Sequence, residues 1–160
     1  MHSNNTNKKG RFVLAMHSAT ETFGVGVVDY KNNSRNYKIG TFPIGRELSN
    51  QVFGCLQELL PKKNWREIAR IAVTIGPGAY TGTRITVAIA RTLAQQLKCD
   101  LDGISSFSLM ASRLSKELEN SEINQPFWIK KNLPRKGIIA GRYQIKDSKI
   151  LELKKPALYN

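Results

Sequence analysis

The sequence is poor in the residues that most often carry enzyme chemistry and bind metals. It has two cysteines and two histidines in 160 residues, and neither cysteine has a cysteine or histidine nearby at a metal-ligand spacing. We therefore expect Cys55 and Cys99 to be reduced, buried thiols. No H-E-x-x-H or G-x-S-x-G motif is present, and no serine, histidine and aspartate can be assembled into a relay. The sequence thus predicts no catalytic residue and no metal site.

Long hydrophobic runs are also absent. No apolar run approaches the roughly 20 residues of a membrane-spanning helix, and the N-terminal residues contain no hydrophobic segment of the signal-peptide type. These absences predict a cytoplasmic protein that does not contact a membrane. Residues 1–10 are polar and rich in asparagine and lysine, so we expect a disordered leader there. Apolar residues make up 41% of the chain, which predicts a globular core.

Acidic residues are few: 12 aspartates and glutamates stand against 25 lysines and arginines, giving a net charge of +13. This balance favours attraction to nucleic acid or to an acidic partner. The basic residues are dispersed, however, with no run longer than two and no aromatic–basic interleaving of the kind that stacks bases. A general enrichment in lysine, asparagine and isoleucine would also explain the charge, so a basic RNA-binding module is one alternative among several.

The order of the apolar segments predicts an α/β fold. Strand-like segments at residues 12–16, 22–29 and 36–42 form a meander, and an apolar helical stripe follows at residues 46–60. A short helical connection leads to a buried strand at residues 71–75 and a helix at 83–97. Further on, the pattern predicts a strand at 101–104, a helix at 107–118 and short strands at 127–131, 137–145 and 150–153.

A glycine-punctuated loop, residues 76–82, joins the buried strand to the long helix. It is not a Walker A loop, because no lysine lies between Arg70 and Lys98, and it is not the dinucleotide motif, because Thr81 stands where the third glycine is required. The spacing leaves two interpretations open. The loop is either a tight structural turn or a cradle that presents free N–H groups at the helix start to an anion.

The residues of the loop and helix, GPGAYTGTRITVAIARTLA, closely resemble the corresponding stretch of the bacterial TsaB (YeaZ) family. Proteins of this family are partners of TsaD in making the threonylcarbamoyl modification of adenosine-37 in tRNA. The resemblance implies a ribonuclease H-like lobe of the actin/Hsp70 ATPase superfamily, with a mixed sheet and helices, over residues 11–104. A reduced second lobe would occupy residues 105–160. The loop residues that the resemblance marks for phosphate or partner contact are Gly76, Pro77, Gly78, Tyr80, Thr81, Gly82 and Arg84.

Two positions depart from the family pattern. His17 stands where the family has an aspartate in its strand–turn–strand opening, and Pro134 replaces an aspartate in a later segment. A neutral imidazole is a poor ligand for Mg²⁺, so nucleotide hydrolysis at this turn is not expected. We expect His17 to be a packed turn residue.

The resemblance implies a non-catalytic scaffold that forms a heterodimer with TsaD, with TsaE as a further partner, tRNA contacted indirectly and a homodimer in the absence of partners. It implies no cofactor for this chain alone and ATP only in the complex. The two long helices carry more apolar area than one sheet face needs, so their outer faces are the expected interface. The alternatives are that these residues face the sheet, or that the chain is a stand-alone actin/Hsp70-type nucleotide-binding protein. The expected interface residues are Val52, Leu56, Val87, Ala90, Arg91 and Ala94.

Overall fold

The computed structural model describes residues 10–31, 36–114, 125–133, 136–147 and 149–159. Almost all of the expected leader, the end of the helix expected at 107–118, and Pro134 lie outside the described residues. The chain divides into two compact units, residues 1–103 and residues 104–160.

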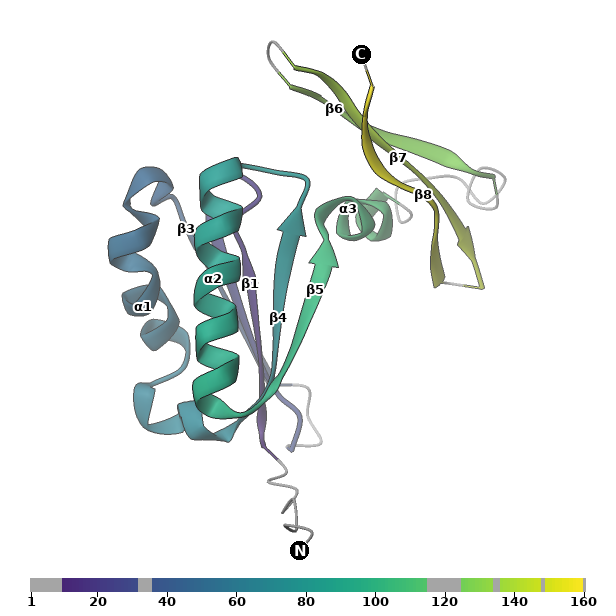
Figure 1. Cartoon of the computed structure of the whole chain (residues 1–160). Coiled ribbons are helices and arrows are strands. Elements are labelled where there is room, and N and C mark those ends of the chain that lie inside the picture. The colour runs from purple at the N-terminus through teal and green to yellow at the C-terminus, as the bar shows by residue number, and fades with distance from the viewer. Residues whose placement is uncertain (1–9, 32–35, 115–124, 134–135, 148, 160) are drawn as a thin grey trace, which may run out of the picture. The chain divides into compact units, whose positions relative to one another are not determined.

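The first unit is built on a mixed five-stranded sheet (Figure 1). The strands lie in the order β3-β2-β1-β4-β5; β1 pairs antiparallel with β2, β2 antiparallel with β3, and β1 parallel with β4. Because the strands show apolar runs or alternation and the segments between them carry turn signals, the sequence placed each strand to within a few residues. Their bounds are β1 Phe12–His17, β2 Phe23–Asp29, β3 Asn36–Phe42, β4 Ile68–Gly76 and β5 Asp100–Ser105.

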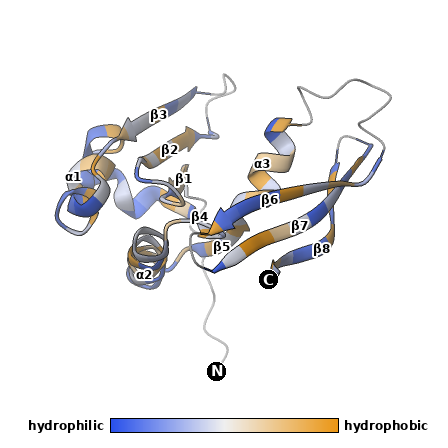
Figure 2. Ribbon diagram, turned by 90° about the horizontal axis from the view of Figure 1, so that it is seen from above, coloured by the Kyte–Doolittle hydropathy of each residue, from blue (hydrophilic) through white to orange (hydrophobic). Residues whose placement is uncertain are grey.

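Two long helices, α1 Leu48–Leu59 and α2 Tyr80–Leu97, pack on one face of this sheet (Figures 1 and 2). Alternate residues of the strands point to them, as Phe12, Leu14 and Met16 of β1 do, and all three are buried. The short 3-10 helices η1 Gly45–Glu47 and η2 Lys62–Glu67 stand before and after α1. The core of the unit therefore lies between one sheet face and the two helices.

The side of α2 that faces the core carries small residues. Thr86, Ala90 and Ala94 are the buried residues of this helix, whereas Ala88 and Thr92 are exposed. Small side chains at i, i+4 and i+8 let the helix lie close to the strands, and the larger isoleucines and leucines pack at its flanks. Lys98 caps the C-terminus of the helix. It adopts the left-handed conformation and donates its backbone N–H to the carbonyl of Ala94.

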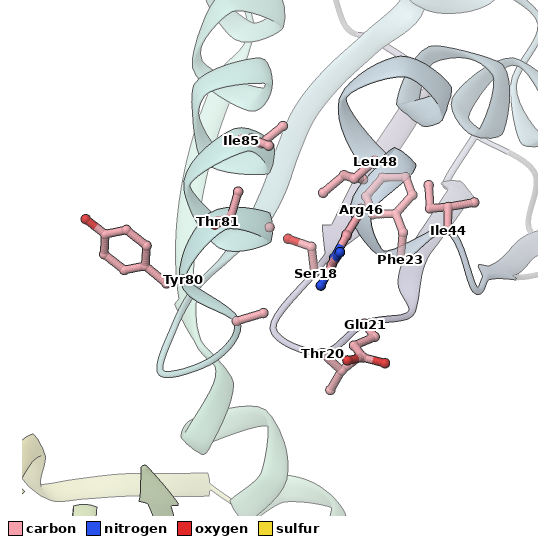
Figure 3. Close-up of a pocket in the computed structure, with 13 residues that line it drawn as sticks. Ser18, Thr20, Glu21, Phe23, Ile44, Arg46, Leu48, Tyr80, Thr81 and Ile85 are labelled. Carbon is pink, nitrogen blue, oxygen red and sulfur yellow. The ribbon is translucent and has the colours of Figure 1, made fainter. Parts of the chain in front are cut away.

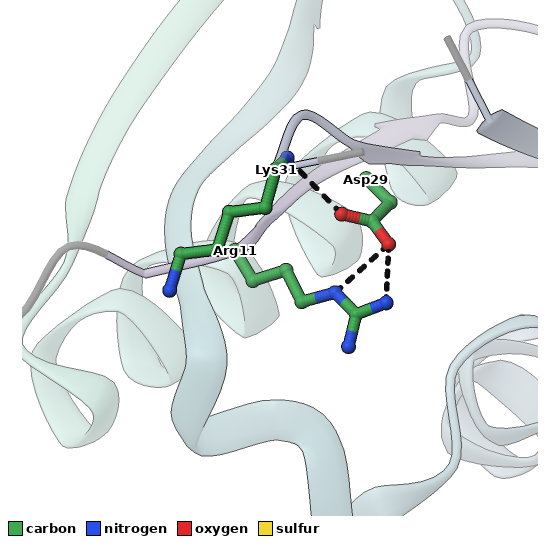
Figure 4. Close-up of polar contacts among 3 residues, drawn as sticks. All are labelled: Arg11, Asp29 and Lys31. Atoms are coloured by element: carbon green, nitrogen blue, oxygen red, sulfur yellow. Dashed lines mark hydrogen bonds and ion pairs between the residues drawn. The ribbon is translucent and has the colours of Figure 1, made fainter. Parts of the chain in front are cut away.

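A salt bridge ties the start of β1 to the end of β2 (Figure 4). Arg11 donates from Nε and Nη2 to Oδ2 of Asp29, at 2.8 and 2.6 Å, and the backbone N–H of Lys31 donates to Oδ1 at 3.2 Å. The carboxylate is buried, and its hydrogen bonds with Arg11 raise the pKa of that guanidinium. The charge of Asp29 is thus compensated where the strand pair begins.

In its described residues, the second unit has a three-stranded antiparallel sheet and one helix. The helix α3, Ser106–Leu114, places Phe107 and Ala111 against Ile129 and Tyr143. The hydroxyl of Tyr143 donates to Oε2 of Glu152 at 3.1 Å, and burial raises the pKa of this tyrosine. The strands, in the order β6-β7-β8, are β6 Phe127–Leu133, β7 Gly137–Lys146 and β8 Lys149–Tyr159.

The last strand is longer than the sequence predicts. The expected strand ended at residue 153, because two lysines and a proline interrupt the apolar pattern there. In the structure β8 continues to Tyr159, with a register shift opposite Ala140, Arg142 and Tyr143. A bulge of this kind accommodates extra residues in an edge strand without ending the pairing, so composition alone marked the end too early.

Candidate functional site

A cleft of about 670 Å³ opens in the first unit at the start of α2 (Figure 3). Its walls are the β1–β2 turn, the segment leading into α1, and the first turns of α2. Phe23 and Leu48 contribute apolar surface, and the polar lining includes Ser18, Glu21 and Arg46. The cleft thus brings together the two segments that the sequence singled out, the glycine loop and the β1–β2 turn.

The glycine loop is fixed to the β1–β2 turn by close backbone packing. A Cβ atom on Gly78 would lie 2.4–2.6 Å from the Cβ, Cα and carbonyl oxygen of Ala19, which no side chain could tolerate. The backbone N–H of Ala79 donates to the carbonyl of Ala19 at 2.8 Å. Gly76 has a φ of +95°, a conformation that favours glycine. Gly76 and Gly78 therefore meet structural needs of a tight turn, as the first interpretation of the loop requires.

The start of α2 also lines the cleft. Ala79 precedes the helix without a side-chain cap, so the first N–H groups of α2 have no intrahelical acceptor. Ser18 is 1% exposed, and within the described residues its hydroxyl has no hydrogen-bond partner. Figure 3 shows this hydroxyl pointing toward the first turn of α2. Together with the guanidinium of Arg46, these groups form a donor set that suits an anion.

The side chains of Tyr80 and Arg84 form a pair at the edge of the cleft. The phenol ring of Tyr80 is 73% exposed and points away from the cleft (Figure 3). Arg84 donates from Nη1 to its hydroxyl, and the guanidinium lies 4.9 Å from the ring centroid. Of the predicted loop residues, Tyr80, Thr81 and Gly82 therefore line the cleft, although the ring of Tyr80 points away from it, and Arg84 is not among the lining residues.

The groups around the cleft provide little acid–base chemistry. Glu21 is the one carboxylate among the lining residues, and His17 is not among them. His17 ends β1 opposite Gly24, and burial lowers the pKa of its imidazole, so the ring is neutral at pH 7. Within the part of the chain that the structure describes, no three metal-ligating side chains come together. In the same residues no helix is both long and apolar enough to cross a membrane.

The two cysteines carry no disulfide. Cys55 is buried in the core and Cys99 is half-buried beside it, and both are free thiols. Burial raises the pKa of both thiols, which keeps them protonated and unreactive at neutral pH. Neither thiol lines the cleft.

The expected interface residues of the two helices need correction. Val52, Leu56, Ala90 and Ala94 are 0%, 1%, 0% and 6% exposed, and all four belong to the core of the first unit. They cannot meet a partner without leaving that core. The small alanines do permit close packing, but they pack against the chain's own sheet. Val87 is half-buried against the same core, and Arg91 is exposed.

The outward faces of the helices instead carry Asn50, Gly54 and Gln57 on α1, and Ala88 and Gln95 on α2. These residues recur at helical spacing opposite the buried stripes. Gly54 is the unusual member, because a Cβ atom built on it would meet no described residue beyond its own helix backbone within 4 Å. Sequence reasoning missed Gly54, although a glycine in the middle of an amphipathic helix was visible as a signal.

Comparisons with known proteins agree with this fold. The sequence model of the TsaD family, tRNA N6-adenosine threonylcarbamoyltransferase, matches residues 32–132. The TsaB proteins "tRNA threonylcarbamoyladenosine biosynthesis protein TsaB" of Bacillus subtilis and of Buchnera aphidicola from Schizaphis graminum are 27% and 31% identical over 108 and 71 residues. These alignments cover 62% and 39% of the chain, and 43% and 34% of the relatives. The chain thus spans well under two thirds of the length of the curated relatives it matches.

The fold is also shared with a solved structure from Pseudomonas aeruginosa, described as an uncharacterized protein with similarity to the peptidase YEAZ. The TM-score is 0.75 at 20% identity, over 93% of this chain and 66% of that one. The strand order, the two helices on one sheet face and this likeness confirm the expected ribonuclease H-like fold of this lobe, with a mixed sheet and helices. The chain therefore belongs to the TsaD family, as a member of its TsaB (YeaZ) branch.

Proposed function

We propose that this chain is a non-catalytic partner of TsaD, and that it supports the N6-threonylcarbamoyl modification of adenosine-37 in tRNA by forming a heterodimer. Family membership supports the pathway. The short supply of acid–base groups in the cleft, with Glu21 as its one carboxylate, agrees with a supporting role. In this proposal the transfer chemistry belongs to TsaD, and this chain supplies a docking surface.

The observation that carries the proposal is the empty space over Gly54 on the outward face of α1. Glycine in a helix interior destabilises it by about 0.8–1.0 kcal/mol relative to alanine. No φ requirement and no neighbouring side chain of the described residues demands a glycine here. A partner helix that lies close against α1 would demand it, because a bare Cα allows two backbones to approach. Ala88 provides a similarly small position on the outward face of α2.

Mixing the chain with TsaD from the same source, followed by size-exclusion chromatography with light scattering, tests the proposal. We expect a one-to-one complex with the unchanged chain and its loss with Ala88→Glu, which places a carboxylate on the exposed outward face. Gln125→Glu, which adds one negative charge at an exposed position of the second unit, is the matched control and should bind normally. Two separate species with the unchanged chain would refute the proposal.

A homodimer formed through the same helix faces is expected when TsaD is absent. Light scattering of the chain alone measures it, and Ala88→Glu should shift the mass to that of a monomer. TsaE is proposed as a further component that joins only after TsaD has bound, in the cytoplasm. Adding TsaE to the chain with and without TsaD, in the same chromatographic assay, tests this order.

A second candidate function is phosphate or nucleotide binding in the cleft, and Ser18 is the observation that favours it. A buried hydroxyl without a partner is costly unless something occupies the space that it faces. The cleft residues fit an anionic group, because Ser18, Arg46 and the free N–H groups of α2 are all donors. Bound there, a nucleotide would supply a phosphoryl chain for these donors to hold.

Isothermal titration with ATP and Mg²⁺ separates the possibilities. Our proposal places ATP in the complex with TsaD, so the chain alone should show no micromolar binding, and the complex should bind. Loss of that binding in Ser18→Ala would assign it to this cleft. Micromolar binding by the chain alone would favour a stand-alone nucleotide-binding protein instead.

A further inference from the structure

One face of the β6–β7–β8 sheet gathers aromatic and basic side chains that are far apart in the sequence. In the register of the sheet Trp128 pairs with Arg142, and Arg142 pairs with Lys154. Lys130 shares this face, two residues beyond Trp128. The helix α3 contacts the opposite face, where Ile129 and Tyr143 are buried. The row Trp128, Arg142 and Lys154 therefore lies on the face that α3 leaves uncovered.

The aromatic rings of this face are held by one lysine. The rings of Trp128 and Tyr159 meet edge to face, with centroids 6.1 Å apart. The ammonium of Lys154 lies 5.7 Å from the Trp128 centroid and 5.2 Å from that of Tyr159. Trp128 is nevertheless 47% exposed. A large apolar ring is thus fixed in place next to cations while half of its surface remains open to solvent.

The charge of this segment is strongly one-sided. Between Phe127 and Tyr159 the sequence has nine lysines and arginines and two acidic residues. One of the acids, Glu152, accepts a hydrogen bond from Tyr143 on the face that α3 covers. The other, Asp147, lies between β7 and β8 in the left-handed conformation. Neither carboxylate shares the row of Trp128, Arg142 and Lys154.

The pairing of the strands supplies a proximity of aromatic and basic residues that the order of the sequence does not contain. Along the sequence the aromatics and cations are separated, and the pairing of three strands brings them onto one surface. Exposed aromatic rings beside lysines and arginines on a sheet are the features that bind RNA with unpaired bases. The rings stack on bases, and the cations neutralise the phosphates.

We propose that this face, defined by Trp128, Lys130, Arg142 and Lys154, binds single-stranded segments of RNA. Trp128 stacks on an unpaired base, and the three cations contact the phosphates on either side of it. An acidic protein surface would satisfy the cations, but it would leave the exposed indole without a planar partner. The inference does not rest on TsaD binding, because all of its residues lie in the second unit.

Fluorescence anisotropy with the full chain and a labelled RNA hairpin that has an unpaired loop tests this proposal. A fully paired RNA of the same stem sequence is the comparison. We expect Trp128→Leu to weaken hairpin binding about 5-fold to 100-fold, the range for one stacked base, while Trp128→Phe retains most of it. Binding to the paired RNA should change little in either variant.

The phosphate contacts are tested by Arg142→Gln combined with Lys154→Gln. Removing each cation that neutralises a phosphate should reduce the slope of log affinity against log salt by about 0.7. Lys62→Gln combined with Lys63→Gln removes the same charge from exposed positions of the first unit and is the matched control. Equal decreases in affinity in the two double variants would mean that only the net charge of the chain attracts RNA, and would overturn the proposal.

Tryptophan fluorescence gives a second, independent readout. The sequence has two tryptophans, Trp65 and Trp128, so a Trp65→Phe background leaves Trp128 as the reporter. Stacking of a base on the indole should quench its emission as the hairpin is added. Circular dichroism melting of each variant establishes that it is folded. Hairpin binding without quenching, or affinity unchanged in folded Trp128→Leu, would contradict the assignment of Trp128.

Discussion

Gly54→Ala is expected to act in opposite directions on the chain alone and on its complex. In the chain alone the new methyl group meets no other part of the described chain within 4 Å, apart from the backbone of its own helix, so it introduces no clash with another element of that part. The remaining effect is the helix preference of alanine over glycine, about 0.8–1.0 kcal/mol in a helix interior. Gly54 lies in the middle of α1, Leu48–Leu59, where this preference applies fully. The free energy of unfolding should therefore rise by about 1 kcal/mol, and the Tm by about 4 °C.

In the complex the same methyl group would lie where the partner helix approaches. Overpacking of a close contact by one methyl group costs about 1–3 kcal/mol, which corresponds to roughly a 5-fold to 100-fold weaker affinity for TsaD. Urea unfolding of the chain alone measures the first effect, and isothermal titration with TsaD measures the second. Gln51→Ala, on the flank of α1, favours the helix without adding volume and should leave the affinity unchanged.

Two outcomes would refute this reasoning. A Gly54→Ala chain that is no more stable than the original would mean that position 54 has a neighbour or a backbone need that the structure does not show. A more stable chain that binds TsaD with undiminished affinity would mean that the partner does not approach α1 at this glycine. The interface would then have to lie on another face of the chain.

Other substitutions test the interior and the pH response. Thr86 is fully buried and its hydroxyl lacks a partner among the described residues, so Thr86→Val should raise the free energy of unfolding by about 1 kcal/mol. Thr92 is the control, because it is exposed and its hydroxyl donates a hydrogen bond to the Ala88 carbonyl. Thr92→Val should change the free energy of unfolding by less than about 0.5 kcal/mol, and urea titration measures both variants. Ala90→Glu buries a carboxylate in the core and should cost more than about 4 kcal/mol, which circular dichroism would detect as loss of structure; a folded variant would contradict the burial of α2. Burial lowers the pKa of His17 below the usual 6.5, so the unfolded chain binds the proton more readily and stability should fall as the pH drops below about 6.5. Urea midpoints measured from pH 8 to 5 should fall less steeply in His17→Gln, and identical profiles would exclude this residue as the cause.

Much of the first unit could be predicted from local patterns. The strand from Asn36 to Phe42 has the predicted bounds, and the strand–glycine loop–helix sequence from Ile68 to Leu97 is present as expected. These elements are predictable because alternation, helical spacing and glycine position are properties of neighbouring residues. The glycine loop also led to the cleft, since its residues mark where a helix begins at the end of a strand.

Local patterns could not predict which side of each helix packs against the sheet. Ala90 and Ala94 suggested a surface for a partner because small residues allow close approach, but the structure uses them for close approach to the sheet. The spacing is the same in both cases, and only the tertiary packing decides between them. Ser18 lies in the β1–β2 turn that the sequence indicates. Whether its hydroxyl is buried and lacks a partner among the described residues depends on how α2, which is distant in the sequence, packs beside the turn.

The cluster around Trp128 could not be predicted for a related reason. Its members come from three strands, and their proximity depends on a register that includes a bulge in β8. A one-residue change in that register would move the side chains of a strand to the opposite face. Charge counting along the chain therefore found the excess of lysine and arginine but could not locate it on one surface.

The contact between Gly78 and Ala19 limits which substitutions related sequences can accept at these two positions. Two of the three atoms that a side chain at position 78 would strike belong to the backbone of Ala19. No replacement at position 19 could make room, so a change at 78 has no single compensating partner and would require the whole β1–β2 turn to shift. Position 54 has the opposite freedom, because a Cβ atom there would meet no other described part of the chain within 4 Å. Among related sequences, the residues accepted at position 54 would therefore reflect what a binding partner requires. An invariant glycine at position 78 would reflect what the fold requires.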